Sequence, residues 1–333
     1  MSLELWRGVN IEGWLDFLKQ PDAELRFARA DVELLAGLGF DHLRINVNEQ
    51  HLWDESGRPL DETFGLVGTL LDWCEEFGLK AIFDLHVLRC HHFNAPERPL
   101  FTDPPCVERF LDCWRQLSGR LRSRPNHLLA YEFLNEPVAD DPEDWNRVSD
   151  AVFRVLRDLE PERTLILGSN RWSEPESFQY LTVPDDRNLI LTFHFYRPML
   201  LTHHRAQWTE LGAYSGPVHY PGRPLSDADI KALTDEERRV LEPRNTHCDR
   251  AALDARLATP LEVAEHSGLP LYCGEWGCIR NAPRDDRLRW HTDMISILAR
   301  HGIGWAVYSY WSRFGAVQTG EGIDEELVGI LTS

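Results

Sequence analysis

Runs of apolar and β-branched residues recur eight times along this 333-residue chain, and more polar segments separate them. Several runs are too continuously apolar for a strand with one face in water, so they are typical of strands buried on both faces. The predicted strands are residues 6–11, 42–47, 80–86, 128–136, 164–169, 189–196, 269–277 and 304–312.

Between these strands, apolar residues recur at spacings of three and four, which is the pattern of an amphipathic helix. Gly78 and Gly302 each follow such a segment, and glycine is the usual residue after the last turn of a helix. We therefore expect a helix after most strands. The predicted helices are residues 63–77, 107–121, 143–158, 176–181, 249–267 and 285–301.

The alternation of strand and helix, repeated eight times, predicts an α/β protein with a closed (β/α)₈ or TIM barrel. Barrels of this length form one domain, and no linker divides the sequence, so we expect a single domain over residues 1–333. Residues 197–248 separate the sixth strand from the next helix and are rich in His, Trp, Tyr and Pro. Loops of such length in compact domains are usually lids or binding walls.

Charge and cysteine content narrow the range of partners and compartments. With 54 acidic and 35 basic residues the formal net charge is −19, which disfavours nucleic acid and anionic membrane surfaces as partners. No apolar run is long enough for a membrane span, and the first residues lead into a strand rather than a signal peptide. Seven cysteines, an odd number, favour free thiols and a cytoplasmic protein, with secretion as the alternative if a leader was removed.

Polar and aromatic residues gather at the predicted carboxyl ends of the strands, where barrel enzymes carry their active sites. In the fourth strand, Pro137 cannot continue the ladder, so Asn135 and Glu136 come at its end. The other strand-end residues are Arg44 on the second strand, His86 on the third, His194 and Tyr196 on the sixth, Glu275 on the seventh and Trp311 on the eighth.

Two carboxylates on nearly opposite strands suit glycosidic bond cleavage by double displacement. Arg44 and Tyr196 beside Glu275 would keep that carboxylate ionised as the nucleophile. Glu136 needs a raised pKa to act first as acid and then as base. Asn135 can donate to a sugar 2-hydroxyl. We predict that the two carboxyl carbons lie about 5 to 5.5 Å apart, the separation of a retaining enzyme.

This set of residues, in this strand order, resembles glycoside hydrolase family 5 of clan A, the cellulase family. The resemblance implies a retaining β-glycosidase that acts on neutral β-linked glucans or oligosaccharides, with Glu136 as acid/base and Glu275 as nucleophile. It implies no cofactor and no metal. A β-mannanase or an exo-acting β-glucosidase is the alternative on the same scaffold. The matching positions are Arg44, His86, Asn135, Glu136, His194, Tyr196, Glu275 and Trp311.

Two segments depart from the patterns of this family. Residues 202–208 are similar to a Thr-His-Gln-Gly-Ala-x-Trp pattern of a bacterial cellulase-like branch, but His-Arg stands in place of Gln-Gly. This difference bears on substrate specificity rather than on the chemistry. Residues 86–94, HVLRCHHFN, stand where such enzymes often carry Pro-Gly, and this difference predicts a remodelled floor of the cleft.

Aromatic residues supply candidate platforms for sugar rings, and we assign Trp172, Trp208 and Trp311 to substrate binding, the last as an apolar face for the pyranose C–H groups. A place in the core is the alternative for each aromatic candidate, and Arg44, His86 and His194 have purely structural alternatives. The further candidates are Trp276, Phe93, Tyr214 and Tyr220.

Three other hypotheses concern the site as a whole. A zinc site could use Cys90, His91 and His92 with Cys106 and the pair His203-His204, although their spacing is not that of common zinc motifs. A metal-dependent barrel hydrolase would use His86, His194 and the carboxylates as ligands. A carbohydrate-binding barrel without catalytic activity is the hypothesis outside enzymes.

Overall fold

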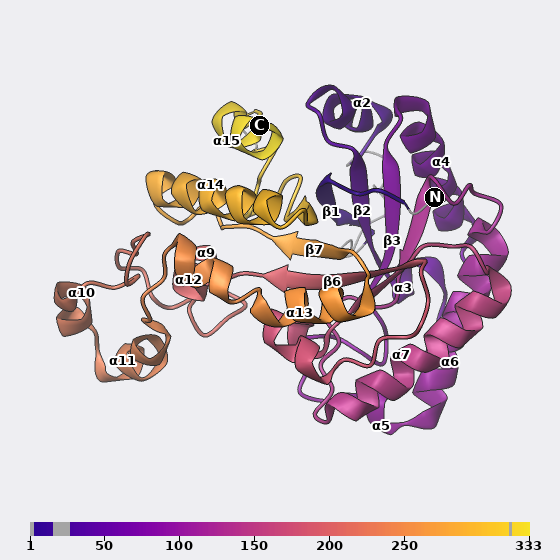
Figure 1. Cartoon of the computed structure of the whole chain (residues 1–333), viewed down its shortest axis with the longest axis horizontal. Coiled ribbons are helices and arrows are strands. Elements are labelled where there is room, and N and C mark those ends of the chain that lie inside the picture. Colours follow the sequence, from indigo (N-terminus) through magenta and orange to yellow (C-terminus); the bar gives the residue numbers. More distant parts are fainter. Residues whose placement is uncertain (1–2, 16–26, 320–321) are drawn as a thin grey trace.

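The computed structural model describes residues 3–15, 27–319 and 322–333. Within these residues, eight parallel strands close into a barrel in the order β1 to β8, which confirms the predicted fold class (Figure 1). The strands are β1 Arg7–Leu15, β2 His42–Asn48, β3 Lys80–Val87, β4 Leu129–Glu132, β5 Leu165–Gly168, β6 Leu189–Phe195, β7 Leu271–Trp276 and β8 Gly304–Val307.

Helices surround the barrel, and the long ones follow their predicted ranges closely (Figure 1). The predicted helix at 249–267 is divided into α12 and α13, and the fifth crossover has only α8 and a 3₁₀ turn. The helices are α2 Arg29–Gly37, α3 Glu49–Leu52, α4 Asp61–Phe77, α5 Pro99–Thr102, α6 Pro104–Leu121, α7 Pro142–Leu159, α8 Asn170–Ser173, η1 Pro175–Tyr180, α9 Met199–Thr202, α10 Asp227–Ala232, α11 Asp235–Leu241, η2 Glu242–Arg244, α12 Arg250–Ala255, α13 Ala258–Ser267, α14 Arg284–Arg300 and α15 Glu325–Thr332.

The interior of the barrel is divided into an apolar layer and a polar layer. Ile82, Ala130 and Ile190 belong to one buried apolar cluster inside the barrel. Side chains alternate along a strand, so the residues two positions further along β3 and β4, Asp84 and Glu132, share this inner face one layer closer to the carboxyl ends. Both acids are buried. The alternation therefore places an apolar floor beneath a layer of charged side chains.

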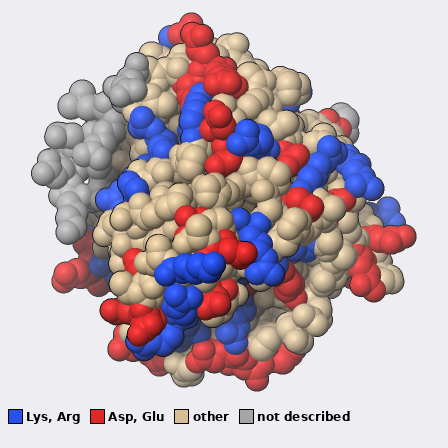
Figure 2. Space-filling view, turned by 90° about the vertical axis from the view of Figure 1, so that its left-hand side faces the viewer, with Lys and Arg blue, Asp and Glu red and all other residues tan. Residues whose placement is uncertain are grey.

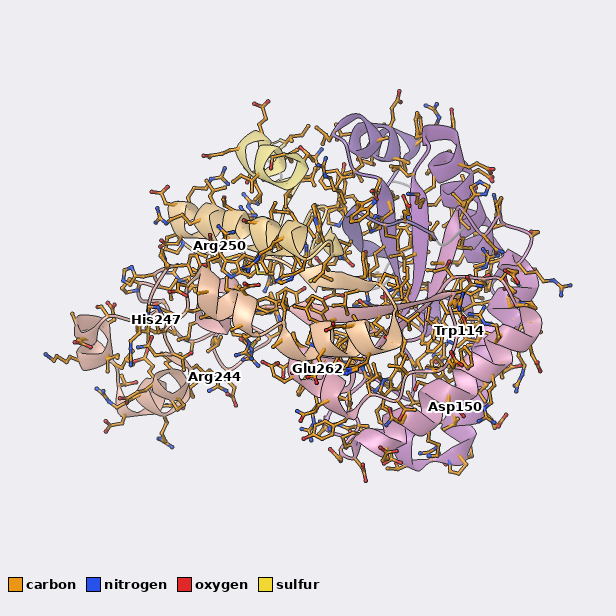
Figure 3. All side chains as sticks on the ribbon, in the orientation of Figure 1. Trp114, Asp150, Arg244, His247, Arg250 and Glu262 are labelled. Carbon is orange, nitrogen blue, oxygen red and sulfur yellow. The ribbon has the colours of Figure 1, made fainter. Side chains whose placement is uncertain are left out.

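The predicted fourth and eighth strands, residues 128–136 and 304–312, extend too far. In the structure β4 ends at Glu132 and β8 ends at Val307. The apolar composition continues beyond both strands because the following loops are themselves buried: Phe133 and Leu134, for example, are almost inaccessible to solvent. Trp114 of α6, labelled in Figure 3, supports this loop from outside by donating from Nε1 to the Phe133 carbonyl at 3.2 Å.

The long segment after β6 consists of two different parts. The backbones of Gly222 and Cys248 exchange two hydrogen bonds, of 2.8 and 2.9 Å, so residues 223–247 form a closed excursion. It carries α10 and α11, which project to the far left in Figure 1, and Arg244 and His247 lie there in Figure 3. Figure 2 views this end of the molecule, where acidic and basic side chains are interspersed. Only the first part, residues 197–221, lies directly after β6 at the barrel mouth.

Three of the predicted sugar platforms are buried in the structure. Tyr220 is buried and donates to Asp293 Oδ2 at 2.7 Å, and Tyr214 is buried with its hydroxyl donating to the Pro217 carbonyl at 2.8 Å. Trp276 on β7 is fully buried against Trp290 and Trp305. These side chains are packed inside the protein, so they are not platforms for a sugar. Across the described ranges, the helices are all too short or too polar to span a bilayer.

Candidate active site

Arg44 on β2 is the centre of the polar layer and is completely buried. Its Nη1 donates to Glu275 Oε1 at 2.7 Å and to Asn10 Oδ1 at 2.8 Å. Asn10, on the neighbouring strand β1, in turn donates to the Gly274 carbonyl of β7 at 2.9 Å. Residues of three strands thus hold the guanidinium against the Glu275 carboxylate. The hydrogen bond between them is charge-assisted and therefore strong.

The other side of the guanidinium faces acids that sequence patterns did not single out. Glu132 accepts from Nε at 2.7 Å and from Nη2 at 2.9 Å, and Asp84 Oδ2 lies 3.1 Å from Nη2. Burial raises the pKa of Asp84 to about 7 and raises that of Glu132, although Arg44 opposes both shifts. The fork-shaped donor set of arginine fits this arrangement, which a lysine could not satisfy. The sequence did contain a sign that Asp84 belongs to the site, since Asp84 precedes His86 by two positions on the same face of β3.

Glu275 lies at the end of β7 and is nearly inaccessible to solvent. Besides the bond from Arg44, its Oε2 accepts a hydrogen bond of 2.9 Å from the Tyr196 hydroxyl. Burial raises the pKa of Glu275, and Arg44 is the strongest opposing influence. The carboxylate is thus held in place by one cation and one hydroxyl, both of which favour its ionised form.

Glu136 stands four residues beyond the end of β4 and has a left-handed backbone with φ of 45°. The extended alternation that we predicted for this segment is therefore wrong at Glu136, because the backbone turns away there. His194 Nδ1 lies 3.0 Å from Glu136 Oε1, and His91 Nε2 lies 3.1 Å from the Glu136 carbonyl oxygen. A non-glycine residue in this conformation costs about 1–3 kcal/mol, so surrounding contacts must hold it.

The two carboxyl groups are neighbours. One oxygen of Glu136 and one of Glu275 lie within 4.8 Å of each other and of a nitrogen of His194. Burial raises the pKa of Glu136 well above its usual range, and the negative charge of Glu275 raises it further. Arg44 contacts Glu275 and not Glu136, so a proton shared by the pair resides on Glu136.

The two predicted histidines are both neutral. Burial lowers the pKa of His86 to about 3 and lowers that of His194 well below the usual range. His86 Nδ1 lies 2.7 Å from Asp84 Oδ2, which links it to the Arg44 network, whereas His194 lies between the carboxylates, 3.7 Å from Glu275 Oε2. Both rings thus serve as fixed hydrogen-bond partners in this site.

Asn135 is placed beside the carboxylates by its backbone and its side chain. Its N–H donates to the Leu85 carbonyl at 3.1 Å, and its Oδ1 accepts from Arg44 Nη2 at 3.0 Å. Its buried Nδ2 has no hydrogen-bond partner among the described residues. A buried unpaired donor costs about 1–3 kcal/mol, so a ligand that accepts from Nδ2 gains correspondingly.

Trp172 and Trp208, the two predicted platforms, are partly exposed, at 37% and 46%. Trp172 follows β5 in a left-handed conformation, with φ of 61°, and donates from Nε1 to the Phe93 carbonyl at 3.0 Å. Trp208 packs on Phe314, with ring centroids 6.4 Å apart, and Phe314 packs on Tyr196 at 5.9 Å. Both indoles are thus exposed and fixed at one edge, as stacking platforms are.

We expected Trp311 at the end of β8, but β8 ends at Val307 and Trp311 lies away from that end. It packs on Phe27 at a centroid distance of 5.9 Å and lies over Gly13 near the end of β1. The first residue after β8 is instead Tyr308, whose ring is 6.4 Å from that of Tyr196. Tyr308 was not among the predicted site residues because the predicted strand extends to residue 312, whereas β8 ends at Val307. A sugar contact by Trp311 stays a prediction.

The cysteine and histidine cluster has a structural arrangement rather than that of a zinc site. His91 contacts Glu136, Cys90 Sγ lies 3.8 Å from the Cys106 carbonyl, and all seven cysteines are free. Over the ranges that the structure describes, the one group of His, Cys, Asp and Glu close enough to share a metal ion is Glu136, His194 and Glu275. His86 is not part of that group.

Comparisons with known proteins agree with this geometry. The family model described as Cellulase (glycosyl hydrolase family 5) matches residues 12–314. Endoglucanase C from Acetivibrio thermocellus is 29% identical over 333 residues, 97% of each chain, and cellodextrinase A from Ruminococcus flavefaciens is 28% identical over 89% of this chain and 83% of that one. The structure of Thermotoga maritima Cel5A in complex with cellobiose shares the fold, with a TM-score of 0.79 and 24% identity over 98% of this chain and 97% of that chain. The chain therefore belongs to glycosyl hydrolase family 5, the cellulase family, and is a glycoside hydrolase.

Proposed function

We propose that this glycoside hydrolase cleaves neutral β-linked glucan oligosaccharides or polysaccharides with retention of anomeric configuration. The observation that carries the proposal is the contrast within the carboxylate pair: Glu275 bonds to Arg44 and Tyr196, whereas Glu136 has a strongly raised pKa. A retaining enzyme needs one ionised and one protonated carboxyl group at about 5–5.5 Å. One carboxylate oxygen of each glutamate lies within 4.8 Å of the other, and the separation of the carboxyl carbons stays a prediction.

In the first step, the Glu275 carboxylate attacks the anomeric carbon and forms a glycosyl ester. The bond from that carbon to the glycosidic oxygen breaks, and Glu136 gives its proton to this oxygen, so the leaving group departs as a neutral alcohol. Arg44 and Tyr196 fix the attacking oxygens, which removes the need to reorganise them during the reaction.

In the second step, water replaces the leaving group. Esterification has removed the negative charge of Glu275, which was one cause of the raised pKa of Glu136. The pKa of Glu136 therefore falls, and the carboxylate takes a proton from water while the water oxygen attacks the anomeric carbon and expels Glu275. The sugar is released with its original configuration, and Glu136 is protonated again.

Asn135 is the residue that we assign to the sugar 2-hydroxyl. Its Nδ2 is a buried donor with no protein partner within the described part of the chain, and its Oδ1 is occupied by Arg44. The orientation of the amide is thus set, with a donor left for the substrate. A hydrogen bond to the 2-hydroxyl strengthens as the transition state forms, which adds to catalysis rather than to binding alone.

The substrate class follows from the wall of the site and from the relatives. Trp172 and Trp208 are partly exposed and can stack on pyranose rings, and the Arg313 guanidinium lies over the Trp208 ring at 5.3 Å. Among the described residues, Arg44 is already matched by three acids. The relatives are named endoglucanase and cellodextrinase, and the related Cel5A has been crystallised with cellobiose and with mannotriose. A β-glucan is thus our first choice, and a β-mannan the second.

We also infer a reducing, cytoplasmic compartment. The seven cysteines are free thiols, and most are buried. Proteins of oxidising compartments usually pair their cysteines.

Product analysis tests the proposed function. We expect the purified protein to release reducing sugar from at least one of β-glucan, xyloglucan, mannan and short cello-oligosaccharides. Proton NMR at early times should detect the β-anomer first. Early α-product would contradict double displacement, and no release from the whole panel would favour a binding barrel. Loss of activity with a chelator, restored by zinc, would favour a metal site at Glu136, His194 and Glu275.

A further inference from the structure

The two glutamates divide the barrel mouth into two halves. Glu136 follows β4 and Glu275 ends β7, and a substrate chain that passes between them has its ends over β5–β6 and over β8–β1–β2. The Glu136 carboxyl is turned toward His194 of β6, at 3.0 Å. Since Glu136 protonates the leaving oxygen, the leaving group lies over β5–β6. The glycone, which stays on Glu275 after the first step, lies over β8–β1–β2.

Glu12 is an acid on the glycone half that the mechanism does not use. It lies on β1 two positions after Asn10, where the pairing of β1 with β2 loses its regular register, so its surroundings are defined by its contacts. Its side chain is partly exposed although β1 and the loop after β8 enclose it. Paired residues Val9 and Val307 bring that loop alongside. Both serines that bind Glu12 lie on the loop after β8, at the carboxyl end of the barrel, where the two glutamates also lie.

The loop after β8 is built around the Glu12 carboxylate. Glu12 Oε2 accepts from Ser309 Oγ at 2.8 Å and from Ser312 Oγ, and Ser312 has a left-handed φ of 74°. Burial raises the pKa of Glu12, and hydrogen bonds from Ser312, Ser309 and Tyr308 oppose this. The two serine bonds both reach Oε2. The strained Ser312 indicates that the loop holds this carboxyl group in one orientation.

A continuous wall joins Glu12 to the reacting carboxylate. Tyr308 hydrogen-bonds with Glu12, and its ring lies 6.4 Å from that of Tyr196. Tyr196 in turn donates to Glu275 at 2.9 Å. The first glycone sugar, held over Glu275, therefore lies against Tyr196 and Tyr308. Glu12 is the next side chain along this wall after Tyr308.

We infer that Glu12 is a specificity-determining residue that accepts hydrogen bonds from hydroxyl groups of the second glycone sugar. The inference rests on the proposed function, because it assumes that a β-linked oligosaccharide crosses the mouth between the two glutamates. A carboxylate accepts from two hydroxyls at once, and such charge-assisted bonds are about twice as strong as neutral ones. Glu12 thus favours chains with two or more glycone sugars.

Aryl glycosides with one or two glycone sugars and the same leaving group test this inference. In the wild type, we expect kcat/KM to be higher for the aryl β-cellobioside than for the aryl β-glucoside. In Glu12→Ala, the cellobioside value should fall roughly 10-fold or more, mainly through KM, while the glucoside value stays within about two-fold. Glu12→Gln, which keeps the shape and the bonds to the serines, should show an intermediate loss.

The control is Glu262→Ala, which removes an exposed acid from α13 outside the barrel (Figure 3). It should leave the ratio between the two substrates unchanged. An equal loss on both substrates in Glu12→Ala, with a lower melting temperature, would mean that Glu12 only braces the loop and would overturn the inference. An unchanged ratio would overturn it as well.

A separate measurement distinguishes failure of the proposed function. If the wild type hydrolyses neither glycoside nor the polysaccharide panel, the proposed function fails, and calorimetric titration with cellobiose then tests Glu12 without turnover. Weaker cellobiose binding by Glu12→Gln than by the wild type would support the site. Equal binding by both proteins would overturn it.

Discussion

Around Glu275 the barrel supplies a buried guanidinium and a tyrosine hydroxyl, whereas around Glu136 it supplies a neutral imidazole and a backbone contact from His91. Both regions hold a glutamate with little exposure to solvent, and the charge of the neighbours differs between them. Two identical side chains less than 5 Å apart are thereby prepared for opposite tasks, one as an anion and one as an acid.

The two regions also differ in how the backbone presents the side chain. Glu275 belongs to a strand, so the sheet itself fixes its direction. Glu136 lies beyond its strand in a left-handed conformation and depends on side chains from other loops. The acid is thus the more vulnerable of the pair, since changes outside β4 can move it.

Removing each carboxylate should have the largest effect and separate the two roles. We expect Glu136→Ala to lose about 10²- to 10⁴-fold in turnover on oligosaccharides, and Glu275→Ala to lose more. Azide should restore activity to both variants with different products. The Glu275 variant should give the glycosyl azide of inverted configuration, and the Glu136 variant that of retained configuration, as chromatography and NMR can establish.

The assignment of different roles to the two glutamates would be wrong if both variants gave the same azide anomer. Near-normal turnover in either variant would remove that glutamate from the mechanism. Thermal melting of both proteins serves as the folding control.

His91 tests whether the acid depends on a neighbouring loop. His91→Phe removes the contact to the Glu136 carbonyl, and we expect roughly a 10-fold lower turnover on oligosaccharides because the acid is less well placed. An aryl glycoside with a good leaving group needs little protonation, so its hydrolysis should change much less. Kinetics on both substrate types provide the measurement.

His92→Phe is the matched control, since His92 stacks on Phe93 and is hydrogen-bonded to the Asn94 N–H instead. A His91 variant that slows both substrate types equally would show a general structural role and no effect on the acid.

Trp208→Ala should weaken binding more than folding. The indole is 46% exposed, so we expect KM for oligosaccharides to rise several-fold while the melting temperature changes little. Trp172→Ala is the companion variant on the β5 side. If Trp208 merely anchors its loop on Phe314, the loss in unfolding free energy should instead reach about 3–5 kcal/mol, with normal kinetics per folded molecule.

The smallest predicted effect is on the pH dependence of the unfolding free energy, and Asp84→Asn tests it. The pKa of Asp84 rises from 3.8 to about 7 on folding, so the folded state holds a proton that the unfolded chain releases. The unfolding free energy should therefore decrease as pH rises from about 4 to about 7, by at most about 1.4 kcal/mol per pH unit from this group. Asp84→Asn should flatten that decrease in denaturant titrations between pH 5 and 8. An unchanged slope would assign the effect to other carboxyl groups.

Local patterns were sufficient to predict the barrel and the pairing of the two glutamates. The strands are recognisable because residues such as Ile82 and Ile190 must be buried on the inner face whatever the loops do. Arg44 and His194 lie on strands where alternation fixes the direction of the side chain, whereas Glu275 faces inward because a register shift in β7 interrupts the alternation that begins at Tyr272. For Arg44 and His194 the sequence alone determined both position and orientation.

Beyond the strand ends, only the tertiary structure decided where each side chain points. Glu136 turns into a left-handed conformation, Tyr308 takes the place expected for Trp311, and Tyr220 is buried against α14. Periodicity ends where the ladder ends, and beyond it the direction of a side chain depends on contacts between loops far apart in sequence. For the same reason the link between Glu12 and Ser312, 300 positions apart, became apparent only when the closed barrel brought β1 beside β8.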